Sequence, residues 1–147
     1  MRRLVIDASV AIKWVIEEPG TAEALALRRY RLLSPDLLIP ECANILWKKT
    51  CRQEIGLDES LLAARLLERA DVELLPMRRL FEPATRLAIR LNHPAYDCVY
   101  LALAQASGCS FVTADSRFCT KVRPHVPPNQ VLNLADALTR LDAKSDQ

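Results

Sequence analysis

Short apolar segments alternate along this chain with segments of helical periodicity, and this alternation limits the folds that it can adopt. Strands that are apolar throughout and are separated by helices are typical of a parallel sheet covered by helices on both faces. We therefore predict an α/β fold with a five-stranded parallel sheet in the order 3-2-1-4-5. Strands are expected at 3–7, within 34–40, within 71–77, within 109–115 and within 130–134, and helices over 9–17, 21–32, 40–54, 56–70, 80–92, 95–107 and 134–142.

The size and composition of the chain narrow its class. Its 147 residues are enough to bury one core, so a single domain over 1–147 is expected. The net charge of +2 is too small to indicate a polyanion-binding surface by itself. The five cysteines form no CxxC pair or zinc-type spacing, and they fit small buried side chains in a reducing cytoplasm. Because no stretch approaches the roughly 20 apolar residues that cross a bilayer, we expect a cytoplasmic protein outside the membrane.

Four acidic residues follow predicted strands or open the helices after them. Asp7 ends the first strand, Glu41 follows the second, Asp97 lies in the first turn of the helix over 95–107, and Asp115 ends the fourth strand. In open α/β sheets the ligand site lies outside the carboxyl ends of the strands. Each acid alone could simply cap a helix or favour its dipole. Together they would repel one another unless a cation neutralised them, and an oxygen-only donor set suits Mg²⁺ or Mn²⁺.

Other phosphate-handling folds do not fit the sequence. The chain has only three glycines, Gly20, Gly56 and Gly108, so a Walker loop and a dinucleotide fingerprint are both excluded. Position 9 is Ser9, so the first strand is not followed by the paired aspartates of a haloacid-type phosphatase. A phospho-receiver module would need an acid after the third strand and a lysine after the fifth, and neither is present.

Four sequence blocks resemble the motifs of PIN-domain ribonucleases, most closely those of VapC-type toxins. The blocks are VIDASVAIKWVIEE, LLIPECANILWKK, HPAYDCVYLALAQASG and FVTADSRF, and they occur in the family's order. The resemblance covers the chain from Arg3 to about Leu134. It places the family's metal-binding acids at Asp7, Glu41, Asp97 and Asp115, with Ser9, Asn44 and Thr113 as supporting polar residues.

The resemblance implies a PIN-like fold and a metal-dependent endoribonuclease that uses Mg²⁺ or Mn²⁺. RNA phosphodiester bonds would be hydrolysed by a metal-activated water, with no side chain as the nucleophile. The family also implies homodimers and a cognate antitoxin, which could lay an apolar helix on the toxin and deliver an Arg or Lys into the acidic pocket. The alternative is a non-catalytic PIN scaffold that binds RNA or a protein partner.

Several basic residues could steer RNA towards the acids. Arg117, Lys121 and Arg123 follow the last acid directly, and Lys13 lies about six residues after Asp7. Packing of its stem at the core edge is an equal alternative for Lys13, and the other basic clusters of the chain fit solvated helix faces.

The histidines and tryptophans receive structural interpretations. His93 and His125 have no partner at ligand or triad spacing, so they are interpreted as structural or solvent-facing. Trp14 and Trp47 lie on amphipathic helices, where core or dimer packing is favoured over base stacking.

Overall fold

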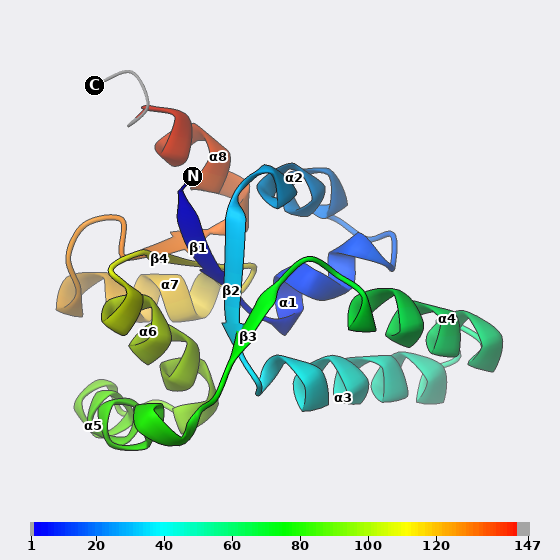
Figure 1. Cartoon of the computed structure of the whole chain (residues 1–147), viewed down its shortest axis with the longest axis horizontal. Coiled ribbons are helices and arrows are strands. Elements are labelled where there is room, and N and C mark those ends of the chain that lie inside the picture. The colour runs from blue at the N-terminus through cyan, green and yellow to red at the C-terminus, as the bar shows by residue number, and fades with distance from the viewer. Residues whose placement is uncertain (1, 144–147) are drawn as a thin grey trace.

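The sheet has the predicted topology. In the computed structural model, which describes residues 2–143, five parallel strands run in the order β3-β2-β1-β4-β5 (Figure 1). The strands are β1 (Arg3–Ile6), β2 (Arg31–Pro35), β3 (Glu73–Leu75), β4 (Ser110–Thr113) and β5 (Val131–Asn133). The α-helices are α1 (Ala8–Ala11), α2 (Thr21–Ala26), α3 (Leu38–Cys51), α4 (Leu57–Glu68), α5 (Phe81–Leu91), α6 (Ala95–Ser107), α7 (Ser116–Val122) and α8 (Leu134–Ala143). Short 3₁₀ helices lie at η1 (Ile12–Trp14), η2 (Leu27–Arg29), η3 (Arg78–Leu80) and η4 (Arg123–His125).

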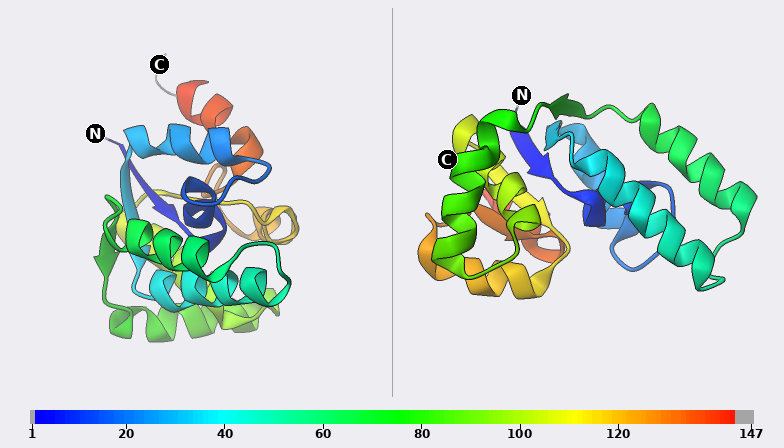
Figure 2. Two further views of the ribbon diagram at one scale, coloured as in Figure 1. Left: turned by 90° about the vertical axis from the view of Figure 1, so that its right-hand side faces the viewer. Right: turned by 90° about the horizontal axis from the view of Figure 1, so that it is seen from below.

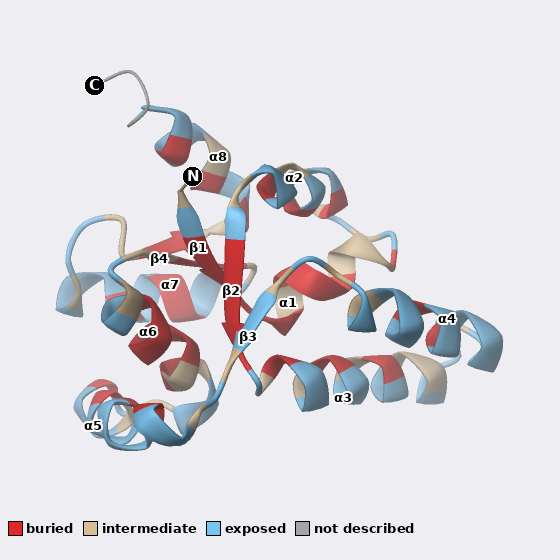
Figure 3. Ribbon diagram, in the orientation of Figure 1, coloured by how far each residue is buried: buried red, intermediate tan, exposed pale blue. Residues whose placement is uncertain are grey.

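Helices cover both faces of the sheet because alternate residues of each strand point to opposite sides. On β1, Val5 packs in one apolar cluster with side chains of α5, α6 and α7. Leu4 and Ile6 pack in a second cluster with α1, α2, α8 and the start of α3. Buried residues accordingly concentrate in the central strands and on the sheet-facing side of α6 (Figure 3).

The pair formed by α3 and α4 extends beyond the edge of the sheet, as two views show (Figure 2). A third apolar cluster holds it to the rest of the molecule through Ile12, Ile16, Leu46 and Ala63. Many apolar side chains of this pair stay exposed, among them Ile39, Leu61 and Leu66.

The strand register brings the ends of β1 and β4 together. Ile6 pairs with Val112 in the parallel ladder, so the residues that follow, Asp7 and Thr113, lie side by side at the carboxyl edge. This is the edge at which α1, α3 and α7 begin. The fold therefore places both residues at the edge where the sequence predicts a ligand site, and we refer to this edge, with the acids that lie along it, as the crevice.

The second strand differs from its predicted position. β2 occupies Arg31–Pro35 and so begins before the predicted range of 34–40, and α3 begins at Leu38 rather than at Pro40. The predicted helix over 21–32 ends earlier, because α2 stops at Ala26 and η2 at Arg29. A short apolar run cannot by itself distinguish a strand from a buried helical turn, and 37–39 is such a run.

Three further helical details were predicted incorrectly or missed. α1 ends at Ala11 and continues only as η1, short of residue 17. The sequence also favours Asp58 as the N-cap of α4, but the N-cap is Gly56 and Asp58 lies inside the first turn. The predicted helices do not include α7, which directly follows Asp115. Among the described residues, no helix has the length and apolar character needed to span a membrane.

Candidate active site

Asp7 lies at the centre of the crevice, buried between β1 and β4. It is the N-cap of α1, and its Oδ1 accepts hydrogen bonds from Ser9 Oγ at 2.5 Å and from the Val10 amide at 3.3 Å. Its Oδ2 accepts a hydrogen bond from Thr113 Oγ1 at 2.6 Å. The side chain therefore caps a helix and also binds the neighbouring strand.

The two hydroxyl groups are fixed as donors to Asp7. Ser9 Oγ accepts the Ala114 amide at 3.0 Å, and Thr113 Oγ1 accepts the Asp115 amide at 3.1 Å. Each hydroxyl group therefore donates its own hydrogen bond to the Asp7 carboxylate. Ser9 and Thr113 take the supporting places that the resemblance implies.

Burial disfavours the charged form of Asp7. It raises the pKa of this carboxyl to about 6, against the opposing effect of the Ser9 and Thr113 hydrogen bonds. The negative charge of Asp97 raises this pKa further. A cation at this position would remove both penalties.

Glu41 approaches the crevice from the first turn of α3. Its Oε2 accepts a hydrogen bond from the Tyr100 hydroxyl at 2.9 Å. Burial, followed by the charges of Asp7 and Asp97, raises the pKa of Glu41, while the bond from Tyr100 opposes that rise. Burial and the nearby Glu41 carboxylate raise the pKa of Tyr100, which stays a donor.

Tyr100 is a site residue that sequence reasoning missed. It is fully buried on α6, three residues after Asp97 and therefore on the same side of the helix. This spacing was the available signal. It was obscured because a tyrosine on a helix that is apolar nearly all round fits simple core packing.

Asp97 lies in the first turn of α6, and it has a partner that was not expected. Its Oδ2 lies 2.7 Å from Nε2 of His93. The interpretation of His93 as a residue without a ligand-type partner is therefore wrong.

Asp115 is the N-cap of α7 and is exposed. Its Oδ1 accepts a hydrogen bond from the Phe118 amide at 3.1 Å. Its main-chain amide is held by Thr113, the residue that also binds Asp7. The structure thus places all four acids at the carboxyl edge of the sheet, with Asp115 turned towards its own helix.

The carboxylates fit a divalent cation by their chemistry, although they do not form a closed cage. Within residues 2–143, no three His, Cys, Asp or Glu side chains are grouped as a ready-made metal site. Asp7, Glu41 and Asp97 are nevertheless near enough to influence the pKa values of Asp7 and Glu41. Several oxygen donors that repel one another are what a hard cation such as Mg²⁺ or Mn²⁺ stabilises.

The other residues predicted for the site differ in whether they contact other protein groups. Asn44 is exposed on α3, close to one turn beyond Glu41. Lys13 forms an ion pair with Glu18 at 2.8 Å. Lys121 Nζ donates a hydrogen bond to the Asn92 carbonyl at 2.7 Å.

Arg117 and Arg123 are exposed, on α7 and on η4. Both therefore lie on the elements that follow the last of the four acids. Lys13 and Lys121, in contrast, have protein partners in this structure.

The fold and the acidic crevice define a PIN-domain protein, and the PIN domain family model matches residues 4–123. Similar proteins identify the group within the PIN-domain proteins to which the chain belongs. Ribonuclease VapC9 of Mycobacterium tuberculosis is 33% identical over 114 residues, which cover 78% of this chain and 87% of that protein. Ribonuclease VapC3 of Pyrobaculum aerophilum is 31% identical over 133 residues, with 86% and 99% covered. The chain therefore belongs to the VapC ribonuclease family.

Solved structures share the fold at lower sequence identity. PAE2754 from Pyrobaculum aerophilum superposes with a TM-score of 0.71 at 22% identity, covering 97% of this chain and 90% of that one. Mycobacterium tuberculosis VapC20, described as a sarcin-ricin loop cleaving toxin, gives a TM-score of 0.61 at 15% identity, with 80% and 93% covered.

Proposed function

We propose that this chain is an endoribonuclease toxin that hydrolyses RNA phosphodiester bonds with Mg²⁺ or Mn²⁺. The observation that carries the proposal is the convergence of Asp7, Glu41 and Asp97 at the carboxyl edge of the sheet. There the charge of Asp97 contributes to the raised pKa of Asp7, and the charges of Asp7 and Asp97 contribute to that of Glu41. A member of the VapC ribonuclease family with this crevice has the groups that the reaction needs.

Each residue of the crevice has a distinct role in the proposal. Asp7, Glu41, Asp97 and Asp115 would hold the cation, and Asp115 would have to turn away from its cap to do so. When bound, the cation supplies positive charge beside the scissile phosphate and lowers the pKa of a water molecule. Ser9 and Thr113 orient Asp7, and Tyr100 orients Glu41.

The RNA backbone is proposed to approach over α7 and η4. Arg117 and Arg123 are exposed there, on the two elements that follow Asp115, and basic side chains attract phosphate groups. Lys121 and Lys13 are weaker candidates, because both already bind protein groups. Asn44 is proposed as a supporting polar residue on α3.

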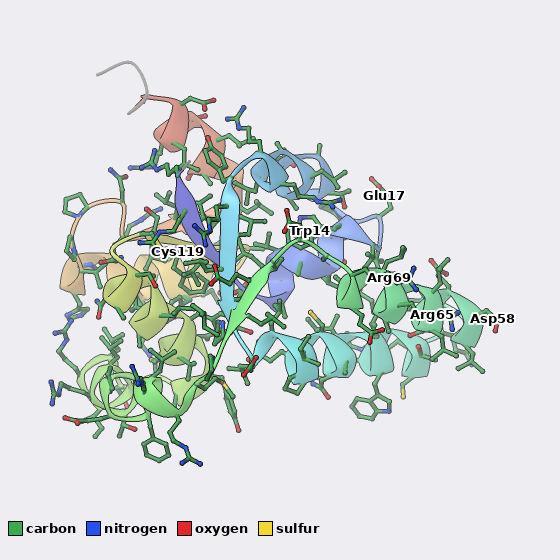
Figure 4. All side chains as sticks on the ribbon, in the orientation of Figure 1. Trp14, Glu17, Asp58, Arg65, Arg69 and Cys119 are labelled. Carbon is green, nitrogen blue, oxygen red and sulfur yellow. The ribbon has the colours of Figure 1, made fainter. Side chains whose placement is uncertain are left out.

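The reaction can be tested with purified protein and a panel of structured RNAs. With Mn²⁺ present, we expect endonucleolytic cleavage that EDTA abolishes and that Asp7→Asn reduces by at least about 100-fold, because charge stabilisation of this kind is worth several kcal/mol. Asp58→Asn is the matched control. Asp58 is exposed in the first turn of α4, at the outer end of this helix (Figure 4). The activity of Asp58→Asn should therefore equal that of the wild type.

The alternative of a non-catalytic scaffold makes the opposite prediction. If the wild type leaves every RNA intact while another PIN enzyme cleaves them in the same assay, the scaffold interpretation is correct. Equal activities for Asp7→Asn and the wild type would show that any cleavage came from elsewhere.

We also propose that a cognate antitoxin binds the groove beside α3 and α4. A cavity of about 510 Å³ lies there, lined mainly by apolar side chains that include Ile39, Leu46 and Leu61. Arg65 and Glu68 are its charged residues. An amphipathic helix could bury its apolar face in such a groove and bind these charges at its edge.

Two further parts of the proposal concern assembly and location. We propose that the chain forms homodimers. The exposed side chains of Phe81 and Ile89 on α5 offer an apolar surface for the contact. Sedimentation equilibrium of the purified protein tests the oligomeric state. The chain is proposed to act in the cytoplasm, where its RNA substrates would be found.

A further inference from the structure

His93 connects the acidic crevice to α7 through both ring nitrogens. Its Nε2 lies 2.7 Å from Asp97 Oδ2, and its Nδ1 lies 3.5 Å from Lys121 Nζ. The same ammonium group donates to the Asn92 carbonyl at 2.7 Å. The imidazole also packs against the Phe118 ring, with the ring centroids 4.9 Å apart.

The contacts favour one of the two neutral tautomers of His93. An ammonium group can only donate, so the nitrogen that faces Lys121 must accept. The proton of the neutral ring then lies on Nε2 and is donated to Asp97. An imidazolium would instead point a second N–H at the Lys121 ammonium group.

The bond from His93 leaves one carboxylate oxygen of Asp97 available. In the part of the chain that the structure describes, no other hydrogen bond to the Asp97 side chain is present. Metal-ligating carboxylates are commonly held by such hydrogen bonds, which fix their orientation and tune their affinity.

We propose that His93 is a positioning residue that holds Asp97 so that its free oxygen faces the divalent cation, with Lys121 fixing the tautomer of His93. The inference rests on the proposed metal site. It assigns a function to two residues that are otherwise interpreted as a structural histidine and an RNA-binding lysine. It also gives α7 a function in the crevice in addition to presenting Asp115.

Two substitutions separate the hydrogen bond from the packing of the ring. His93→Phe keeps a flat ring against Phe118 but removes both nitrogens. His93→Gln loses the stacking but places an amide nitrogen near the position of Nε2, from which it can donate to Asp97. His125→Phe is the control, because His125 is exposed on η4 and, among residues 2–143, its hydrogen bond is the one that its main-chain carbonyl accepts from Arg90.

The affinity for Mn²⁺ is measured by electron paramagnetic resonance of the free ion, without RNA. We expect His93→Phe to bind Mn²⁺ about 10-fold more weakly than the wild type, a typical loss for such a partner of a metal ligand. His93→Gln should stay within about 3-fold of the wild type on the same scale, as should His125→Phe. ¹⁵N NMR of the metal-free wild type should show the proton of the His93 ring on Nε2.

The outcomes distinguish this inference from the proposed function. If the wild type binds Mn²⁺ and His93→Phe binds it equally well, the positioning role is wrong while the metal site stands. A loss of Mn²⁺ affinity in His93→Gln without a loss in His93→Phe would show that ring packing matters and that the hydrogen bond does not. A proton on Nδ1 of His93 would also overturn the positioning role. A wild type that binds no Mn²⁺ would overturn both the positioning role and the proposed metal site.

Discussion

Asp7 combines two functions that favour different charge states. As the N-cap of α1 and the acceptor of two hydroxyl groups, it is stabilised as an anion. Its burial has the opposite effect and dominates, because the pKa rises to about 6. The Asp7 carboxylate therefore lowers the stability of the protein without metal. This is expected of a metal ligand, whereas a residue that only capped a helix would raise the stability.

The pH dependence of stability should reveal this charge. The folded pKa of Asp7, about 6, exceeds its ordinary value of 3.8, so the folded state binds the proton more tightly. In EDTA, the free energy of unfolding should therefore fall by roughly 3 kcal/mol as the pH rises from about 3 to 7, from this group alone. The free energy of unfolding of Asp7→Asn should not show this decrease. At pH 7, Asp7→Asn should be no less stable than the wild type.

Urea denaturation of both proteins at several pH values measures the effect. The difference between the two proteins reports Asp7 together with its effect on Glu41, because Glu41 titrates in both proteins and the charge of Asp7 contributes to its raised pKa. Parallel curves for the wild type and Asp7→Asn would contradict the account given for Asp7.

The partners of the acids were harder to predict than the acids. The acids follow strands within family motifs, and local sequence carries that information. The bond from Tyr100 to Glu41 joins residues 59 positions apart, so only the tertiary fold, which brings α6 and the start of α3 to the same edge, determines it. His93 lies four residues before Asp97, but Pro94 separates it from the helix, so the usual spacing rule for helical pairs gave no indication.

At the scale of the elements, the strand order was predictable and some boundaries were not. Apolar strands between helices determine a parallel sheet with acids at its carboxyl edge. The start of α3 depended on how 37–39 pack, since these apolar residues fit a strand or a helix equally well. α7 was missed because its seven residues are too few to show a clear helical period, although Asp115 provides its N-cap.

The pair formed by α3 and α4 provides a test of the antitoxin groove. Leu61 and Leu62 are neighbours on α4 with exposures of 47% and 52%, but only Leu61 lines the cavity. Leu61→Asp should weaken the binding of the polypeptide encoded by the adjacent reading frame by at least about 10-fold, because it places a charge in an apolar interface. Leu62→Asp should bind as the wild type does, as measured by calorimetry.

Equal binding by both variants would place the partner elsewhere on the molecule. A loss of equal size in both would indicate damage to α4 itself. The thermal melting of each free variant distinguishes that case, since neither substitution should unfold an exposed helix position.

For the whole molecule, the crevice brings together segments that are far apart in the sequence. Asp7 follows β1, Glu41 begins α3, Asp97 begins α6 and Asp115 begins α7. These elements lie on different sides of the sheet (Figures 1 and 2). A cation that binds all four acids would therefore join both helical layers, and its effect should appear in the stability of the entire fold.

We expect Mn²⁺ to raise the melting temperature of the wild type, because the unfolded chain cannot assemble these acids. At a free concentration about 100 times the dissociation constant, the gain is about 2.7 kcal/mol, which corresponds to roughly 5–10 °C for a chain of this size. Asp97→Asn should shift less at the same concentration, since it loses one ligand, yet its metal-free melting temperature should not fall, because a mutually repelling charge is removed. Asp58→Asn should shift as the wild type does. A differential scanning fluorimetry series with EDTA as the baseline measures all three, and equal shifts for Asp97→Asn and the wild type would show that Mn²⁺ binds outside the crevice.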